Sequence, residues 1–99
     1  MRFAQRVVVI TGGAKGIGAG CSKVFAQEGG LVAILDRDLD AARATAQRLG
    51  DQHLAVRCDV ACEKQIAAGI AEVVERFGQI DCLINNAGIH PPDTPLLAA

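Results

Sequence analysis

A glycine-rich segment, Thr11 to Gly18, holds the residues whose types and spacing could do chemistry. It reads TGGAKGIG and follows a short run of β-branched residues. Side chains in such a segment would keep a pyrophosphate away from the backbone, so bare positions at Gly12, Gly16 and Gly18 could let that group rest on the amides of a helix N-terminus. The segment therefore predicts a binding site for a dinucleotide.

The same segment has other interpretations. A P-loop is excluded, because Ile17 stands where the pattern GxxxxGK[ST] requires glycine. A glycine-rich turn that binds no ligand stays open. Lys15 could lie near the adenosine end of the dinucleotide, or it could be a solvated surface lysine.

An acidic residue, Asp36, ends the next apolar run, eighteen residues after Gly18. At the carboxyl end of a neighbouring strand, its carboxylate could accept hydrogen bonds from the adenine-ribose hydroxyls. A 2′-phosphate beside it would be repelled by on the order of 4 kcal/mol at about 4 Å and an effective dielectric constant of about 20, which favours NAD over NADP. Alternatively, Arg37 could hold that phosphate, or Asp36 could cap a helix, although Asp38 is better placed to do so.

Strand and helix patterns alternate along the chain in the order β-α-β-α-β-α-β. Strands separated by helices run parallel, which predicts a doubly wound, Rossmann-like α/β sheet with strand order 3-2-1-4. The predicted strands are Arg6–Ile10, Leu31–Leu35, His53–Cys58 and Ile80–Ile84, and the predicted helices are Gly16–Glu28, about Asp38–Leu49, and a third through Ile66–Phe77.

Each predicted helix carries an apolar stripe that should face the sheet. The stripes are Ile17, Cys21, Val24 and Phe25 in the first helix, Leu39, Ala42, Ala46 and Leu49 in the second, and Ile66, Ile70, Val73, Val74 and Phe77 in the third. A glycine follows soon after each stripe and predicts the helix end.

Length and composition indicate one globular domain over residues 1–99. The chain is 51% hydrophobic and 21% charged, with a formal net charge of -1. It has no basic stripe and only three aromatic residues, which argues against a nucleic-acid partner. Its apolar runs are far shorter than the roughly 20 residues of a membrane span, and no signal peptide is evident, which predicts a cytoplasmic protein.

Four cysteines stand at positions 21, 58, 62 and 82. Neither a CxxC pair nor a histidine lies at a metal-ligand spacing, so we expect no metal site. The cysteines are better interpreted as small, reduced, buried hydrophobic residues.

Four motifs together resemble the short-chain dehydrogenase/reductase family, in the same order and at the same separations. They are TGGAKGIG, the acid at position 36, Asp59-Val60, and Asn85-Asn86-Ala87-Gly88. The resemblance covers Arg6 to Gly88 and implies an NAD-dependent oxidoreductase acting on an alcohol or ketone. The tripeptide His90-Pro91-Pro92 is similar to the type 14 17β-hydroxysteroid dehydrogenase branch, which implies a steroid-like substrate.

The resemblance also implies which residues contact NAD. The pyrophosphate and nicotinamide-ribose side would be surrounded by Gly12, Gly16, Ile17 and Gly18. Asp36 would hold the adenine ribose.

The adenine end of NAD would meet two later motifs, as the resemblance implies. Asp59 would reach the adenine amino group beside the Val60 backbone, and Asn86 with the Ala87-Gly88 backbone would contact the adenosine. Asn85 would tie this loop to the sheet. Alternatively, Asp59 only starts the third helix, and the two asparagines are structural.

The chain departs from the family pattern in two ways. Ala61 stands where the family commonly has a Ser or Thr that caps the third helix, which puts that helix start in doubt. The family also uses a Tyr-x-x-x-Lys pair and a Ser, yet this chain has no Tyr and its one Ser, Ser22, lies in the first predicted helix. His90 is better interpreted as a loop residue than as a substitute acid, so we assign no catalytic residue.

The chain is therefore expected to be the NAD-binding first half of a short-chain dehydrogenase, without turnover on its own. Its small-molecule alcohol or ketone would bind only to a complete enzyme. Leu83 and Ile84 should then be exposed at a sheet edge, which predicts self-association. The alternative is a non-catalytic nucleotide-binding or interaction module with the same fold.

Overall fold

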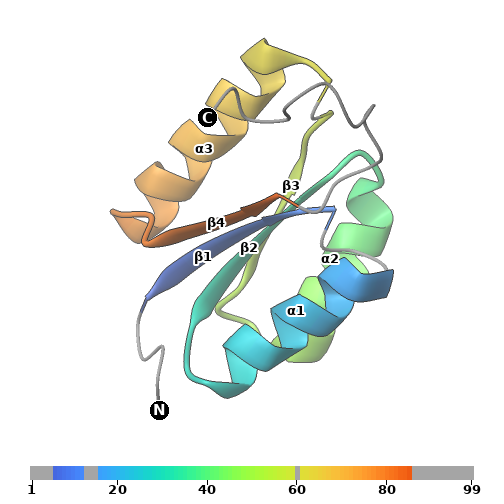
Figure 1. The fold of residues 1–99 in the computed structure, drawn as a ribbon, viewed down its shortest axis with the longest axis vertical. Coiled ribbons are helices and arrows are strands. Elements are labelled where there is room, and N and C mark those ends of the chain that lie inside the picture. The colour runs from blue at the N-terminus through green and yellow to red at the C-terminus, as the bar shows by residue number, and fades with distance from the viewer. Residues whose placement is uncertain (1–5, 13–15, 60, 86–99) are drawn as a thin grey trace.

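The computed structural model describes residues 6–12, 16–59 and 61–85, and within them lies a four-stranded parallel sheet (Figure 1). The strand order β3-β2-β1-β4 confirms the predicted order. The elements are β1 (Val7–Thr11), α1 (Gly16–Gln27), β2 (Leu31–Asp36), α2 (Leu39–Leu49), β3 (Leu54–Arg57), α3 (Glu63–Phe77) and β4 (Cys82–Asn85).

Helices cover both faces of the sheet, with α1 and α2 on one side and α3 on the other (Figure 1). Because successive strand residues point to opposite faces, β1 and β2 supply both cores. The core under α1 and α2 contains Val8, Ile10, Val32, Ile34, Ala42 and Ala46, and the core under α3 contains Val7, Val9, Ala33, Leu35, Val56, Cys58 and Val73. Burial on both faces explains why these strands are apolar throughout instead of alternating.

The apolar stripes of α1 and α3 are wider than the surfaces that they bury. Val24 is 56% exposed and Val74 is 42% exposed, so the prediction that both face the sheet is wrong. Each lies one position away from a residue that does pack against the sheet. Val74 follows the buried Val73, and Val24 precedes the packed Phe25. One position turns a helix by about 100°, which carries these two valines out of the contact.

Three strands begin later than predicted. β1 begins at Val7 instead of Arg6, and at the starts of β4 and β3 a side chain bonds a backbone amide of the neighbouring strand. β4 begins at Cys82 instead of Ile80, since the Asp81 side chain accepts a hydrogen bond from the Val7 amide (Oδ2 to N, 2.7 Å). The Asp81 amide in turn donates to the Val7 carbonyl (2.9 Å). β3 begins at Leu54 instead of His53, because the His53 ring bonds the Val32 amide.

The two later helices begin in different ways. The predicted cap of α2 is confirmed, because Asp38 Oδ1 accepts from the Ala41 amide (3.0 Å). The cap position of α3 is Cys62, which makes no side-chain cap bond. The turn before α3 is instead held by Gln65, whose Oε1 accepts from the Asp59 amide (2.8 Å), so the departure at Ala61 leaves the helix intact. In the described part of the chain, no helix is long and apolar enough to cross a membrane.

Candidate dinucleotide-binding site

The predicted site lies at the carboxyl ends of the strands, beside the topological switch point between β1 and β4. After β1 the chain enters α1 on one face, while β4 pairs with the other side of β1. Ligands of open α/β sheets bind outside the carboxyl ends of the strands at such a switch point. The strand ends at this edge are Thr11, Asp36, Arg57 and Asn85.

Gly12 turns the chain at the end of β1. Its φ of 66° lies in the left-handed region, which a residue with a side chain adopts at a cost. Its amide donates to the Leu35 carbonyl (2.7 Å), so that amide is already satisfied by β2. Gly12 therefore shapes the turn and fastens it beside Asp36, and it is not a donor for a ligand.

Gly16 opens α1 at the same edge and is exposed, as the sequence predicted. Its φ is 58°, and a Cβ built there would meet nothing within 4 Å of it among the described atoms. The first turn of α1 carries no acidic residue, so the positive end of the helix dipole is not neutralised from within. A bare, open helix start of this kind fits an anion such as a pyrophosphate.

Gly18 and Ser22 form the inner side of α1. Gly18 is buried, and its carbonyl accepts a hydrogen bond from the buried Ser22 hydroxyl (2.9 Å). The chain's one serine is thus used within the helix, where it cannot orient a substrate.

The structure brings Asp36 and Asp59 to neighbouring strand ends. The amide of Cys58, the residue before Asp59, donates to the Asp36 carbonyl (3.0 Å). Asp36 Oδ1 accepts from the Asp38 amide (3.0 Å), but the cap of α2 is Asp38 itself, so the alternative that Asp36 is that cap is wrong. The next residue, Arg37, is exposed.

Asp59 has a structural function of its own. Its Oδ1 accepts from the Ala61 amide (3.0 Å), and its carbonyl accepts from the Cys62 amide (2.9 Å). These bonds form the turn that leads into α3, which supports the structural alternative. They leave the residue half-exposed at the same edge as Asp36.

Thr11 is a residue at this edge that the sequence interpretation missed. It is buried, and its hydroxyl donates to Asn85 Oδ1 (2.8 Å) across the paired ends of β1 and β4. Asn85 therefore fastens its strand end to the sheet, as the resemblance implied. The available signal was a hydroxyl residue at the end of a β-branched run, directly before the glycine turn.

Several predicted residues lie outside the described part of the chain. These are Lys15, Val60, Asn86, Ala87, Gly88 and His90, and the Ile17 side chain is not described either. Of the remaining predicted residues, Gly12 is bonded to the residue before Asp36, and Asp59 follows a residue bonded to Asp36. Gly16 and Gly18 lie in the first turn of α1, and Arg37 follows β2.

The cysteines near this edge are not arranged for reaction. All four are free, as predicted, but only Cys58 is buried, in the core under α3. The prediction of burial is wrong for Cys21, Cys62 and Cys82, which are half-buried. Burial raises the pKa of the Cys58 thiol, and electrostatic repulsion from Asp59 and Cys62 adds to the rise. The Cys58 thiol therefore stays protonated at neutral pH. Among the described residues, no group of His, Cys, Asp or Glu side chains could hold a metal ion.

The chain is similar to known proteins in sequence and in fold. L-fucose dehydrogenase of Oryctolagus cuniculus is 46% identical over 95 residues, which are 96% of this chain and 33% of that protein. The 3-oxoacyl-[acyl-carrier-protein] reductase of Mus musculus is 40% identical over 86 residues, 87% of this chain and 36% of that protein. The crystal structure of 3-ketoacyl-(acyl-carrier-protein) reductase from Brucella melitensis complexed with NADH superposes with a TM-score of 0.84 at 39% identity, covering 97% of this chain and 40% of that one.

The chain thus spans about a third of the length of the curated relatives it matches. The family model described as short chain dehydrogenase matches residues 6–97, which is nearly the whole of this chain. With the parallel sheet, the glycine turn and the acid at the end of β2, this match shows that the chain belongs to the short-chain dehydrogenase family.

Proposed function

We propose that residues 1–99 form the dinucleotide-binding part of a short-chain dehydrogenase that interconverts an alcohol and a ketone with NAD. One observation carries the proposal: the open start of α1 at Gly16 and the acid Asp36 lie on adjacent elements of one sheet edge. The hydrogen bond from the Gly12 amide to the Leu35 carbonyl fastens the turn after β1 beside Asp36.

The described residues would divide the dinucleotide between them. Gly16 and Gly18 admit the pyrophosphate to the amides at the start of α1, and Gly12 sets the turn that makes room for it. Asp36 accepts hydrogen bonds from the adenine ribose, and Asp59 faces the adenine. The Brucella melitensis reductase, whose structure is similar, is complexed with NADH, which supports a nicotinamide cofactor here.

The remaining contacts belong to this proposal as well. They are Lys15, Ile17 and Arg37 around the phosphates, and Val60, Asn86, Ala87 and Gly88 around the adenosine. When bound, the nicotinamide ring would supply or accept the hydride. A general acid would have to polarise the substrate oxygen, and this chain has no tyrosine while its one serine is buried. We therefore expect NAD binding by this chain without turnover.

Calorimetric titration of NAD into the chain tests the proposal, with two valine substitutions in α1 as a pair. Gly16→Val puts a branched side chain at a left-handed φ and into the space for the pyrophosphate, so affinity should fall at least about tenfold. Gly20→Val lies one turn along the same helix, where a Cβ also meets nothing within 4 Å but φ is ordinary. It should bind like the wild type. Equal affinities of the two variants, or no binding by a folded wild type, would contradict the proposal.

We further propose that copies of this chain associate through β4. In the described part of the chain, β4 pairs only with β1, which leaves its outer edge as a row of unpaired amides and carbonyls. Leu83 is 38% exposed on that strand, as predicted. Ile84 is half-buried and packs on the core under α1 and α2, so its predicted exposure is wrong.

Sedimentation velocity at several concentrations checks the association. Leu83→Lys places a charge on the edge strand and should shift the chain toward monomer. Ala44→Lys, at an exposed position of α2, is the matched control and should sediment like the wild type. A wild type that stays monomeric at high concentration, or equal behaviour of the two variants, would rule out the β4 edge.

A further inference from the structure

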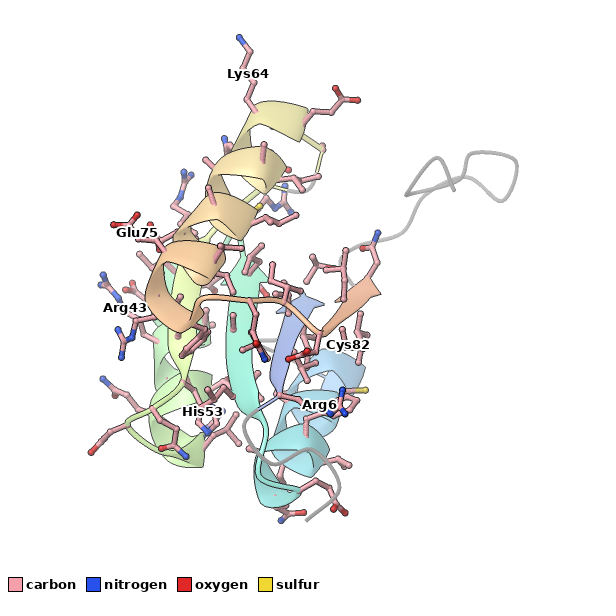
Figure 2. The ribbon with its side chains drawn as sticks, turned by 90° about the vertical axis from the view of Figure 1, so that its left-hand side faces the viewer. Arg6, Arg43, His53, Lys64, Glu75 and Cys82 are labelled. Atoms are coloured by element: carbon pink, nitrogen blue, oxygen red, sulfur yellow. The ribbon has the colours of Figure 1, made fainter. Side chains whose placement is uncertain are left out.

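We propose that His53 is a pH-sensitive latch that holds β3 against β2 only while its imidazole ring is neutral. The latch is independent of the proposed cofactor site and needs no ligand. Figure 2 shows His53 at the far end of the molecule from Lys64, which marks the start of α3. Because α3 starts beside the carboxyl edge, His53 lies at the other end of the strands.

The His53 ring continues the β2–β3 ladder by one step. The first backbone pair of these strands is Ala33 with Leu54. One residue earlier, the Val32 amide donates to His53 Nδ1 at 3.0 Å, and both residues are buried. A side-chain nitrogen thus replaces the backbone carbonyl that the ladder would otherwise supply. β3 has four residues, so this bond is a large part of its attachment.

The hydrogen bond fixes which form of the ring fits. Since Nδ1 accepts a hydrogen bond from the Val32 amide, it carries no proton, and the neutral ring holds its proton on Nε2. Nε2 is buried and has no hydrogen-bond partner among the described residues. Protonation of Nδ1 would set two donors against each other, and it would bury a charge that the Leu49 carbonyl stabilises only in part.

The surroundings of the ring do not compensate for that charge. His53 lines a shallow groove of about 320 Å³ between α2 and β3, whose charged side chains are Arg43 and Asp51. Their opposite charges work against each other, and the other lining residues carry no charge; they are Ala46, Gln47, Gly50 and Ala55. Burial lowers the pKa of His53 below its ordinary value of 6.5, and the Leu49 carbonyl only partly offsets this.

The direction of the pH effect follows from this lowered pKa. Well above pH 6.5 the ring is neutral in both folded and unfolded chains, and the latch contributes fully. As the pH falls below 6.5, the unfolded chain takes up a proton that the folded chain resists. Folding stability is therefore lost on the acid side, by a factor of at most about ten in the unfolding equilibrium constant per pH unit for one proton.

Urea unfolding between about pH 5 and 8, the range in which histidine changes its charge, tests the latch with two asparagine substitutions. His53→Asn keeps an acceptor on the same Cγ but cannot titrate, so it should lose the acid-side fall that the wild type shows. His90→Asn replaces the only other histidine and should keep that fall. Parallel pH curves for the wild type and His53→Asn would overturn the proposal.

Nuclear magnetic resonance of the wild type gives a second test that no variant's misfolding can spoil. The His53 ring should titrate below 6.5, with its proton on Nε2 in the neutral form. The Val32 amide should exchange faster with solvent as the ring protonates. A ring that titrates at or above 6.5, or a Val32 amide whose exchange ignores that titration, would refute the latch.

Discussion

Replacing Asp36 with alanine is expected to weaken NAD binding by about ten- to a hundredfold and to remove most of the preference over NADP. The estimate follows from hydrogen bonds to a charged acceptor, which contribute about 1.5 to 3 kcal/mol. In the wild type, the same carboxylate would repel a 2′-phosphate. Its loss should therefore leave NADP binding unchanged or improve it, because Arg37 is exposed next to the site. Parallel titrations of NAD and NADP measure both effects.

Asp38→Ala is the matched control for this substitution. Asp36 also accepts a bond from the Asp38 amide (3.0 Å), so Asp36→Ala will loosen the start of α2 as well as the site. Asp38→Ala removes the cap of that helix, at about 1 kcal/mol of stability, without touching the ribose position. If Asp38→Ala weakens NAD binding as much as Asp36→Ala does, the loss in both variants comes from the loosened start of α2 and not from a missing contact to the ribose. If the wild type binds NADP more tightly than NAD, the assigned preference is wrong.

Ile34→Ala should destabilise the fold by about 2 to 5 kcal/mol. Ile34 lies in β2 between β1 and β3, fully buried in the core under α1 and α2. A domain of this size has a total stability of about 5 to 15 kcal/mol, so this one cavity takes a large share. Urea denaturation followed by circular dichroism gives the difference in unfolding free energy.

Val24→Ala removes a similar side chain from a different environment. Val24 is 56% exposed on α1, and the change should stay within about 0.5 kcal/mol. The contrast between the two substitutions tests the burial pattern itself. Comparable losses at both positions would mean that the outer face of α1 is covered in solution, for example by a second copy of the chain.

The strand order and the element types could be predicted because local pattern and connection rules both bear on them. Runs such as Val7 to Ile10 are apolar at every position, which indicates strands that are buried on both faces. When parallel strands are joined by helices, the rules for connections allow only a few strand orders. The strand ends could not be predicted. They depend on Asp81 and His53, whose side chains bond backbone amides 74 and 21 residues away, and no local pattern encodes such distant partners.

The candidate site divides in the same way. Gly16 and Asp36 could be located from spacing alone, since each is fixed by the end or start of a regular element. The contributions of Thr11 and Gln65 could not, because each depends on a bond to another element's end. The satisfied amide of Gly12 was also hidden, because only the packing of β1 against β2 shows that the Leu35 carbonyl is its acceptor.

The central position of β1 has a consequence for how the molecule folds during synthesis. β1 leaves the ribosome before the other three strands of the described sheet, yet its partner on one side is β4, and the bond between Val7 and Asp81 joins residues 74 positions apart. Until that late segment emerges, β1 can pair with β2 on one side but has no partner on the other, and contacts so distant in the chain slow folding. A chaperone that shields strand edges should therefore bind nascent chains that end before Cys82 more strongly than longer ones.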